Sequence, residues 1–557
     1  MTDYKFYIKY RVDGVLYGTS KEKCVHYTLE KNITDENIKV IIKPKENVKM
    51  ELLEVKLMSE HQFVEGDNFF SNGFQAWTTS REYNAKDKNR RINPIYKVMD
   101  IAAQFIATSG DFLFVEQEKK PGCFHSFTYT YIRNKDKVEL FGSRSDRVAY
   151  TIFKVDMNGN SLEICKDVVG KTIDSDTVLF DIVHAVGSYD EVFDIYFAAM
   201  NTRKCRIDHM SGYTSWYNYF SKIDENIILR DLDGLDRAKD EVSIYQIDDG
   251  YQVTTGDWTE NEKFPHGMKY IVDKIHDKGY MAGLWVAPFN VTKKSKIYKE
   301  HKDWLITDES GKPMYTTVAW HGGYCMDMYV PGVKEYIKSV FDRVLNEWGF
   351  DMVKLDFLYS QAIYPRNNKT RGEIMYEAID FLRECVGDKL FLGCGVPLAP
   401  CFGVVDACRI SCDVAKNYSD KALRTLNLNK ECPSAINAMT NTIARRHLNG
   451  RAFVNDPDVF FLRDINIKFT EDQKLLLGFI NNLMGDVLFV SDNAGDFSEE
   501  KIEILKRFFK QNNNKVISAD YIDNSNMSIV YTDGENTHTL NFNLFTGESN
   551  VRELLGL

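Results

Sequence analysis

Long hydrophobic runs are missing from the sequence. No stretch of about 18 consecutive apolar residues occurs, so we expect no membrane-spanning helix and no membrane partner. The N-terminal residues MTDYKFYIKYR contain no apolar segment of signal-peptide length, which predicts a cytoplasmic protein. An excess of basic residues is missing too, because 70 Lys and Arg stand against 81 Asp and Glu, for a net charge of −11. Such a chain gains nothing from phosphate attraction, which argues against nucleic acid as a partner.

Metal-binding cysteine patterns are also missing. The 11 cysteines include no Cys-x-x-Cys pair, and no histidine cluster accompanies Cys408 and Cys412. We interpret them as reduced, mostly buried thiols of a cytoplasmic protein. The sequence therefore predicts no metal site, and we expect no organic cofactor.

The chain is long and apolar enough to build several cores. Its 557 residues exceed an ordinary domain of ~100–200 residues, and 44% of them are hydrophobic. Residues 1–190 contain short runs rich in β-branched and aromatic residues, with turn signals such as Asp13-Gly14 and Asn158-Gly159 between them. The runs are KFYIKYRV, VKMELLEVKL, FLFVEQ, HSFTYTYI and KVELFGS. This pattern predicts antiparallel sheets packed as a sandwich.

Residues 191–500 show a different pattern, in which buried strand-like runs alternate with amphipathic helices. The eight strand candidates are GYTSWYNY, VSIYQIDD, MAGLWVAPF, DMVKLDF, KLFLGCG, ACRISCD, RAFVND and DVLFVSD. Helical segments such as KYIVDKIHDKG and GEIMYEAIDFLRECV lie between them. Eight such units describe a (β/α)8 barrel of the α/β class. A doubly wound open sheet is the competitor, but no Gly-rich phosphate loop follows the first strand.

Residues 501–557 predict a small C-terminal β-domain. A helical segment, EEKIEILKRFFKQ, is followed by the strand-like pieces NMSIVYT, THTLNFNLF and VRELLGL. The sequence thus predicts three domains, with bounds 1–190, 191–500 and 501–557.

Charged and polar residues recur where the predicted barrel strands end. The ends carry Asp248-Asp249-Gly250, Trp285, Lys354 and Asp356, Cys394-Gly395, Arg409 and Asp413, Asn455-Asp456, and Asp492. Active sites of such barrels lie at the carboxyl ends of the strands. Buried strands have no stability reason to carry these groups, because an unpaired buried charge is costly. The pattern therefore predicts a polar active site at one rim.

Two aspartates on this rim suit glycoside hydrolysis. That reaction needs one carboxylate at the anomeric carbon and one carboxylic acid to protonate the leaving oxygen. Lys354 lies two residues before Asp356, so on a strand both side chains point to the same face. We expect Lys354 to keep Asp356 ionised by charge pairing, which favours Asp356 as the nucleophile. Arg409 and Asp413 share a face if their strand stays extended.

Each of these residues also has an ordinary structural interpretation. A carboxylate at a strand end can be a helix N-cap or one half of a loop ion pair, and Asp248-Asp249-Gly250 can be a turn. Trp285 can be a core residue. Asp456 and Asp458 in the segment NDPD are more typical of loop ordering than of substrate contact. His321 and His447 look like ordinary loop and helix residues. The functional interpretation is favoured over these structural ones, because such groups recur at the same end of successive strands.

At these positions the sequence resembles glycoside hydrolase family 36, the bacterial α-galactosidases of clan D. The matching segments are WYNYF (216–220), IDDGYQ (247–252), GDW (256–258), FPHGMK (264–269), GLWVAPF (283–289), MVKLDF (352–357), GCGVPLAP (393–400), VDACRISCD (405–413) and NDPD (455–458). SNGFQAW (71–77) matches in the N-terminal domain. The resemblance implies an N-terminal β-supersandwich, a (β/α)8 barrel and a C-terminal antiparallel β-domain.

The resemblance also implies a role for each matching residue. Asp356 would be the nucleophile of a retaining mechanism and Asp413 the general acid/base, in a pair ~5–5.5 Å apart. The other expected contacts surround one sugar. They are Asp248 and Asp249 on O4 and O6, Lys354 on O3 and O4, Arg409 on the O2 side, Trp285 lining the pocket, Cys394 beside C2, Trp77 closing the site, and Tyr213 and Trp216 at the rim.

The chain departs from the family pattern in two places. Ser411 and Cys412 stand where members often have Gly and another residue, and Val396 stands where a small residue is frequent. Neither change removes a catalytic group, so they bear on the substrate rather than on the reaction.

The leading hypothesis is an exo-acting, retaining α-galactosidase that cleaves small galactosides such as melibiose or raffinose-type sugars. The alternative is an α-N-acetylgalactosaminidase, and Cys394 and its neighbours would decide between the two. Galactosyl transfer to a sugar acceptor is a second reaction open to such an enzyme. A non-catalytic sugar-binding protein is the competing class. We expect a monomer or a small homo-oligomer.

Overall fold

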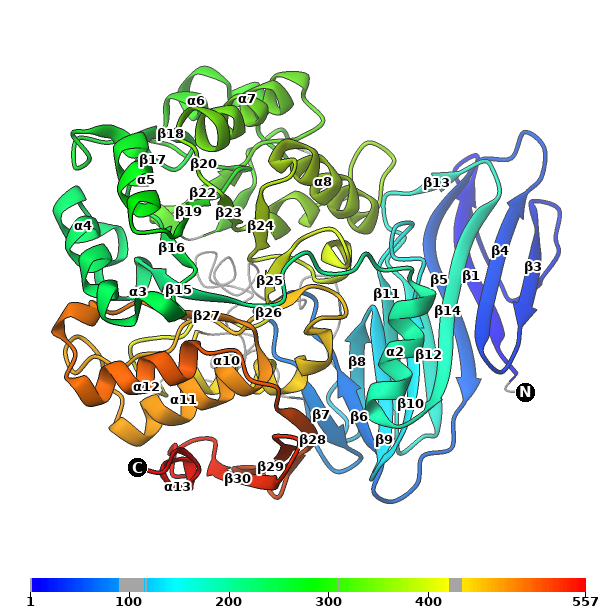
Figure 1. Ribbon diagram of the computed structural model, residues 1–557. Helices are drawn as coiled ribbons and strands as arrows, with labels where there is room; N and C mark the ends of the chain where they lie inside the picture. The colour runs from blue at the N-terminus through cyan, green and yellow to red at the C-terminus, as the bar shows by residue number, and fades with distance from the viewer. Residues whose placement is uncertain (1–2, 90–114, 116–117, 309, 318, 420–432) are drawn as a thin grey trace.

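The computed structural model describes residues 3–89, 115, 118–308, 310–317, 319–419 and 433–557. Two packed antiparallel sheets, a barrel of parallel strands and a small C-terminal sheet lie side by side (Figure 1). The expected fold class is confirmed. The three domain bounds stay a prediction. Of the predicted strand FLFVEQ, only Val115 lies within the described residues.

Within the described residues, the N-terminal sandwich consists of two seven-stranded sheets. The first contains β1 (Lys5–Val12), β2 (Val15–Thr19), β5 (Met50–Glu60), β8 (Cys123–Phe127), β11 (Thr151–Asp156), β12 (Ser161–Lys166) and β13 (Thr172–Ile173). The second contains β3 (Tyr27–Ile33), β4 (Asn37–Pro44), β6 (Asn68–Ser71), β7 (Arg81–Asn84), β9 (Tyr129–Asn134), β10 (Lys137–Ser143) and β14 (Thr177–Gly187). Alternate residues such as Ile8 on β1, Leu57 on β5 and Val40 on β4 lie together in the core of the sandwich, as the period of two requires.

One predicted strand of this domain is divided. The segment HSFTYTYI contributes its first half to β8 and its second half to β9, which lie in different sheets. Thr128 stands at the division with a φ of 69°, in the left-handed region. Continuous β-branched and aromatic composition does not reveal such a break, because it suits both halves equally.

Eight parallel strands form the barrel, and they correspond to the eight predicted runs. They are β15 (Met210–Thr214), β16 (Ile244–Ile247), β19 (Met281–Val286), β23 (Met352–Leu355), β24 (Leu390–Gly393), β25 (Ala407–Arg409), β26 (Val454–Asp456) and β27 (Val487–Val490). Their order is β26-β25-β24-β23-β19-β16-β15-β27. The two end strands approach each other where the Asp486 amide donates to the Asn455 carbonyl at 3.3 Å. The barrel is therefore nearly closed.

Helices cover the outside of the barrel. The described ones are α3 (Trp216–Tyr219), α4 (Glu225–Gly234), α5 (Gly267–Asp277), α6 (Lys296–Glu300), α7 (Pro331–Asp342), α8 (Arg371–Val386), α10 (Ala435–Ala444), α11 (Glu471–Met484) and α12 (Glu499–Phe509). The helix α2 (Tyr189–Ala199) packs instead on β10 and β14 of the sandwich (Figure 1). The predicted strand GYTSWYNY is wrong in its second half, because WYNY forms α3 after β15 ends.

The connection from β24 to β25 departs from the regular repeat. All its residues are described, and it contains a single 3-10 turn (Ala399–Cys401) where other units carry an α-helix. The sandwich domain approaches the barrel here, since the Ala76 amide donates to the Val396 carbonyl at 3.2 Å. Arg445 on the β26 side donates to the carbonyls of Gln75 and Ala76 at 2.9 and 2.7 Å. These contacts bring Trp77 to the barrel rim.

The C-terminal sheet contains β28 (Lys515–Tyr521), β29 (Asn526–Thr532) and β30 (Thr537–Asn543). The last predicted strand is wrong, because VRELLGL forms the short helix α13 (Val551–Leu555), which packs on α11. Val551 and Leu555 lie one helical turn apart and are both buried, a spacing that suits a helix. Within the described part of the chain, no helix is long and apolar enough to cross a membrane.

Candidate active site

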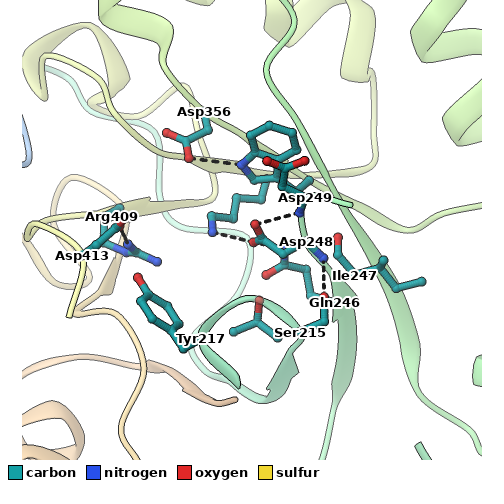
Figure 2. A network of polar contacts seen from close by, with 12 residues as sticks. Ser215, Tyr217, Gln246, Ile247, Asp248, Asp249, Asp356, Arg409 and Asp413 are labelled. Atoms are coloured by element: carbon teal, nitrogen blue, oxygen red, sulfur yellow. Dashed lines mark hydrogen bonds and ion pairs between the residues drawn. The ribbon is translucent and has the colours of Figure 1, made fainter. Parts of the chain in front are cut away.

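The polar groups predicted from the strand ends converge at the carboxyl end of the barrel. Figure 2 shows Asp248, Asp249, Asp356, Arg409, Asp413 and Tyr217 around one shared region. Asp248 and Asp249 follow β16, Asp356 follows β23, and Arg409 ends β25. Parallel strands of a barrel present their carboxyl ends on one face, which explains how residues so far apart in sequence meet.

Asp356 is held by two donors. The Trp285 indole nitrogen donates to its Oδ2 at 3.1 Å, and the Phe357 amide donates to its Oδ1 at 2.7 Å. Phe357 adopts a left-handed φ of 55°, which turns the chain sharply after Asp356. Gly395 lies against the same carboxylate, because a Cβ there would stand 2.8 Å from Asp356 Oδ1. Each carboxylate oxygen therefore has one fixed donor.

Lys354 does not pair with Asp356 as expected. Its ammonium nitrogen lies 2.8 Å from Asp248 Oδ2, and both side chains are almost fully buried. Burial lowers the pKa of Lys354, but Asp248, Cys394 and Asp356 more than offset this, so the pKa lies well above its ordinary value. Asp356 lies just beyond the end of β23 and acts on Lys354 as a nearby charge, so the expected salt-bridge partner of Lys354 is wrong.

Asp248 and Asp249 are individually fixed at the end of β16. Gln246 Nε2 donates to Asp248 Oδ2 at 2.9 Å. Gln252 Nε2 donates to Asp249 Oδ1 at 2.6 Å, and the Trp320 indole nitrogen donates to Asp249 Oδ2 at 2.8 Å. Burial raises the pKa of Asp249, and the Trp320 and Gln252 donors oppose that rise. Both carboxylates thus keep a fixed direction at the rim.

Trp320 is a site residue that the sequence analysis missed. It lies between β21 (Tyr315–Thr317) and β22 (Gly323–Cys325), with a left-handed φ of 54°. Its ring centre lies 4.8 Å from Phe357 and 6.0 Å from Trp285. The segment that contains β21, Trp320 and β22 follows β19 and does not end a barrel strand. A search confined to strand ends therefore does not find Trp320. The tryptophan itself was the available signal.

Arg409 is buried among three carboxylates. Its Nη1 lies 3.0 Å from Asp413 Oδ1, its Nε lies 3.1 Å from Asp456 Oδ2, and its Nη2 lies 2.8 Å from Asp458 Oδ1. β25 stops at Arg409, so the expected extended strand to Asp413 is wrong, and Asp413 stands on the loop beyond. Arg409 and Asp413 nevertheless meet directly.

Asp413 lies in an environment that suits a proton donor. Burial raises its pKa, Arg409 and Lys354 lower it, and the negative charges of Asp356 and Asp248 raise it, with a net rise. Asp356 and Asp413 therefore lie in different environments, one held by two hydrogen-bond donors and one with a raised pKa.

Cys394 and Trp77 approach the same carboxylate loop. Cys394 is fully buried, and burial raises the pKa of its thiol, an effect to which Asp356 adds. The Trp77 ring centre lies 6.1 Å from that of Phe357. The Trp77 indole nitrogen is buried and makes no hydrogen bond to the described residues. The sandwich domain therefore contributes an aromatic group beside the residue that follows Asp356.

Tyr213 does not belong to the site. Its hydroxyl donates to Asp231 Oδ2 on α4 at 2.7 Å, and its ring stacks on Tyr245 at 4.5 Å, both between the barrel and its helices. Trp216 is partly buried on α3, 5.1 Å from the Phe220 ring. Tyr217, the next residue, is the one that reaches the cluster, where its hydroxyl donates to Asp458.

Two other residues have structural roles. Asp492 accepts from the Leu462 and Arg463 amides at 2.6 and 3.0 Å and orders the loop after β26. His447 lies between the sandwich and the barrel, bonded to Tyr129 and Tyr189 at 2.8 Å each. No group of three or more His, Cys, Asp or Glu within the described residues has an arrangement that could hold a metal ion.

The barrel is of the glycoside hydrolase type, with its carboxylate-rich rim and its flanking β-domains. The melibiase family model matches residues 225–379. The resemblance to family 36 found in the sequence is thereby confirmed.

Curated relatives match the central part of the chain. The A type blood α-D-galactosamine galactosaminidase of Flavonifractor plautii is 31% identical over 159 residues, 27% of this chain and 15% of its own length. α-Galactosidase 1 of Pediococcus pentosaceus is 26% identical over 174 residues, 28% of this chain and 23% of its own length. The chain therefore spans less than a quarter of these two relatives.

Solved structures match over nearly the whole chain. The α-galactosidase of Thermus thermophilus in complex with p-nitrophenyl α-D-galactopyranoside has a TM-score of 0.70 and 23% identity, covering 92% of this chain and 98% of its own. The GH36 α-galactosidase AgaA of Geobacillus stearothermophilus has a TM-score of 0.59 and 11% identity, covering 94% and 80%. The fold is that of family 36 glycoside hydrolases.

Proposed function

We propose that this protein is a retaining, exo-acting α-galactosidase that releases terminal α-linked galactose from small oligosaccharides or glycosides. The observation that carries the proposal is the contrast between Asp356 and Asp413 on one rim. Asp356 has a hydrogen-bond donor on each oxygen, whereas Asp413 has a raised pKa. Two carboxyl groups whose environments differ in this way divide into a nucleophile and an acid.

The mechanism is a double displacement. An oxygen of Asp356 attacks the anomeric carbon while the bond to the leaving oxygen breaks, and Asp413 gives its proton to that oxygen. The product is a glycosyl ester on Asp356. Asp413, now ionised, takes a proton from water, whose oxygen attacks the anomeric carbon and releases Asp356. Both protons and both bonds balance over the two steps, and no metal is required.

Sugar recognition rests on fixed polar groups. Asp248 and Asp249 are held by Gln246, Lys354, Gln252 and Trp320, so their remaining lone pairs can accept from galactose hydroxyls with little loss of entropy. Lys354, Arg409, Trp77 and Trp285 complete the proposed pocket. Trp320 joins them as a further wall.

An α-N-acetylgalactosaminidase is the second candidate, favoured by the galactosaminidase relative from Flavonifractor plautii. Such a substrate needs room beside C2, where Cys394 and Val396 are expected. Both side chains are fully buried, which supports the smaller galactose. Cytoplasmic location, oligomeric state and the extent of galactosyl transfer stay predictions.

The deciding experiment compares three aryl glycosides of one leaving group, with α-galactosyl, α-N-acetylgalactosaminyl and α-galactosaminyl moieties. We expect kcat/KM to be highest for the α-galactoside. Turnover of an amino sugar with no turnover of the galactoside would contradict the proposal. Asp356→Asn serves as the inactive control, and a purely sugar-binding protein would show no turnover at all.

A further inference from the structure

The loop that carries Asp413 is held in place by the segment after β26. β25 ends at Arg409, so strand hydrogen bonds do not fix Asp413. The Ile410 amide donates to the Asp456 carbonyl at 3.0 Å, and Ser411 Oγ donates to the Pro457 carbonyl at 2.9 Å. The neighbouring segment 456–458 therefore runs alongside the whole connection from Arg409 to Asp413.

Asp458 makes the decisive contacts of this segment. Its Oδ2 accepts at 2.7 Å from the amide of Val414, the residue that follows Asp413. Its Oδ1 lies 2.8 Å from Nη2 of Arg409, whose Nη1 contacts Asp413. One carboxylate thus holds the backbone on one side of Asp413 and the guanidinium on the other.

The rest of the protein holds Asp458 firmly. Its side chain is fully buried, the Tyr217 hydroxyl donates to Oδ2, and Asn481 Nδ2 donates to its carbonyl at 3.0 Å. Its φ of 79° lies in the left-handed region, which is unfavourable for a residue with a side chain. Strain of this kind persists only where surrounding contacts impose it, and it concentrates at functional sites.

We infer that Asp458 is the positioning residue of the acid/base: it sets where the Asp413 carboxyl lies and, through Arg409, the pH range in which Asp413 keeps its proton. This inference rests on the proposed function. It gives the NDPD segment a role in catalysis, where loop ordering alone was the expectation.

The charges around the cluster are consistent with this role. One guanidinium faces the carboxyl groups of Asp413, Asp456 and Asp458, so the three compete for a single positive charge. Burial raises the pKa of Asp458, Arg409 opposes this, and repulsion from Asp413 and Asp456 adds to it, giving about 7. Among the described residues, the other titratable groups that interact electrostatically with Asp413 or Arg409 are Lys354, Asp356, Asp248, Cys394, Cys412 and Tyr217.

The test compares substrates with good and poor leaving groups. A 2,4-dinitrophenyl α-galactoside needs no proton donor, whereas melibiose does. We expect Asp458→Ala to lower kcat/KM about 100-fold more for melibiose than for the aryl substrate, because a 1 Å displacement of a catalytic group costs about that factor. An equal loss on both substrates would show a purely structural role and overturn the inference.

Two further variants keep the test decisive. Asp458→Asn retains an acceptor for the Val414 amide, so we expect a smaller melibiose-specific loss than in Asp458→Ala. The same change removes one of the carboxylates that face Arg409, so we expect the alkaline limb of kcat/KM to lie at lower pH than in the wild type. An alkaline limb at the same pH as in the wild type would overturn the inference that Asp458 acts on Asp413 through Arg409. Ser411→Ala removes a contact between the same two segments without touching a charge, so we expect the alkaline limb to stay in place and any melibiose-specific loss to be much smaller than that of Asp458→Ala. A wild type inactive on both substrates would instead contradict the proposed function.

Discussion

Lys354 and Asp248 form a buried ion pair, with 2.8 Å between Nζ and Oδ2. The pair joins β23 to the end of β16, and no basic residue in the described part of the chain forms a salt bridge with Asp356. Lys354 therefore holds a proposed sugar-binding carboxylate, and acts on Asp356 only through space.

Replacing Lys354 by Met leaves Asp248 as an uncompensated buried charge. We expect a loss of about 3–5 kcal/mol in the free energy of unfolding, the usual cost of breaking a buried pair from one side. The double variant Lys354→Met/Asp248→Asn removes both charges and should recover part of that loss. Denaturant unfolding of the four proteins in a double-mutant cycle measures the coupling. Additive losses would contradict a direct pair.

The barrel strands and the rim residues were predictable, but contacts between side chains were not. Buried strands with hydrophobic runs are distinctive, and residues at their carboxyl ends must share one face. The partner of Lys354 depends on rotamers and on how β16 lies beside its neighbours, which periodicity does not encode. Aromatic residues favour strands, so the sequence predicts a strand at WYNY, although this segment lies just beyond β15 and forms α3. Trp320 was missed because it lies between β21 and β22 and not at the end of a barrel strand.

Retention of configuration at the anomeric carbon is a direct prediction of the double displacement. Proton NMR during early hydrolysis of an aryl α-galactoside should show α-galactose before mutarotation. Asp356→Gly should be inactive, and azide should restore turnover by forming β-galactosyl azide. Release of β-galactose as the first product would indicate a single displacement and contradict the assignment of Asp356 as nucleophile.

The alkaline limb of the pH profile should follow Asp413. As a general acid Asp413 must be protonated, so kcat/KM falls as pH rises through its pKa. Because burial and the charges of Asp356 and Asp248 raise that pKa, activity should persist above the usual range of an aspartic acid. Wild-type kcat/KM for melibiose should show this limb, and the residual melibiose activity of Asp413→Asn, which has no general acid to lose, should not. A limb that survives the substitution belongs to another group.

Trp320→Phe should weaken substrate binding. The change removes the donor to Asp249 Oδ2, so the pKa of Asp249 rises further and its direction is less fixed. We expect KM for an aryl galactoside to increase about tenfold, in line with one lost hydrogen bond to a charged group. Trp304→Phe is the matched control, because Trp304 stacks on His301 outside the site, with ring centres 3.9 Å apart. Similar effects of both variants would indicate a general disturbance of the segment between β19 and β23.

Gly395→Ala tests whether the position of Asp356 is set by close packing. A Cβ at Gly395 would stand 2.8 Å from Asp356 Oδ1 and 2.9 Å from the Phe357 amide nitrogen, so the nucleophile or its donor must move. Gly387 has a similar φ, +58° against +51°, and open space where its Cβ would lie. Both alanine variants incur backbone strain, since Gly387 has a φ of 58° with a ψ of −127°, a conformation that favours glycine, but only Gly395→Ala displaces the carboxylate. We therefore expect both variants to lose thermal stability, together with a fall in kcat of about 100-fold for Gly395→Ala and near wild-type kcat for Gly387→Ala. Equal kcat values would show that Asp356 tolerates the displacement.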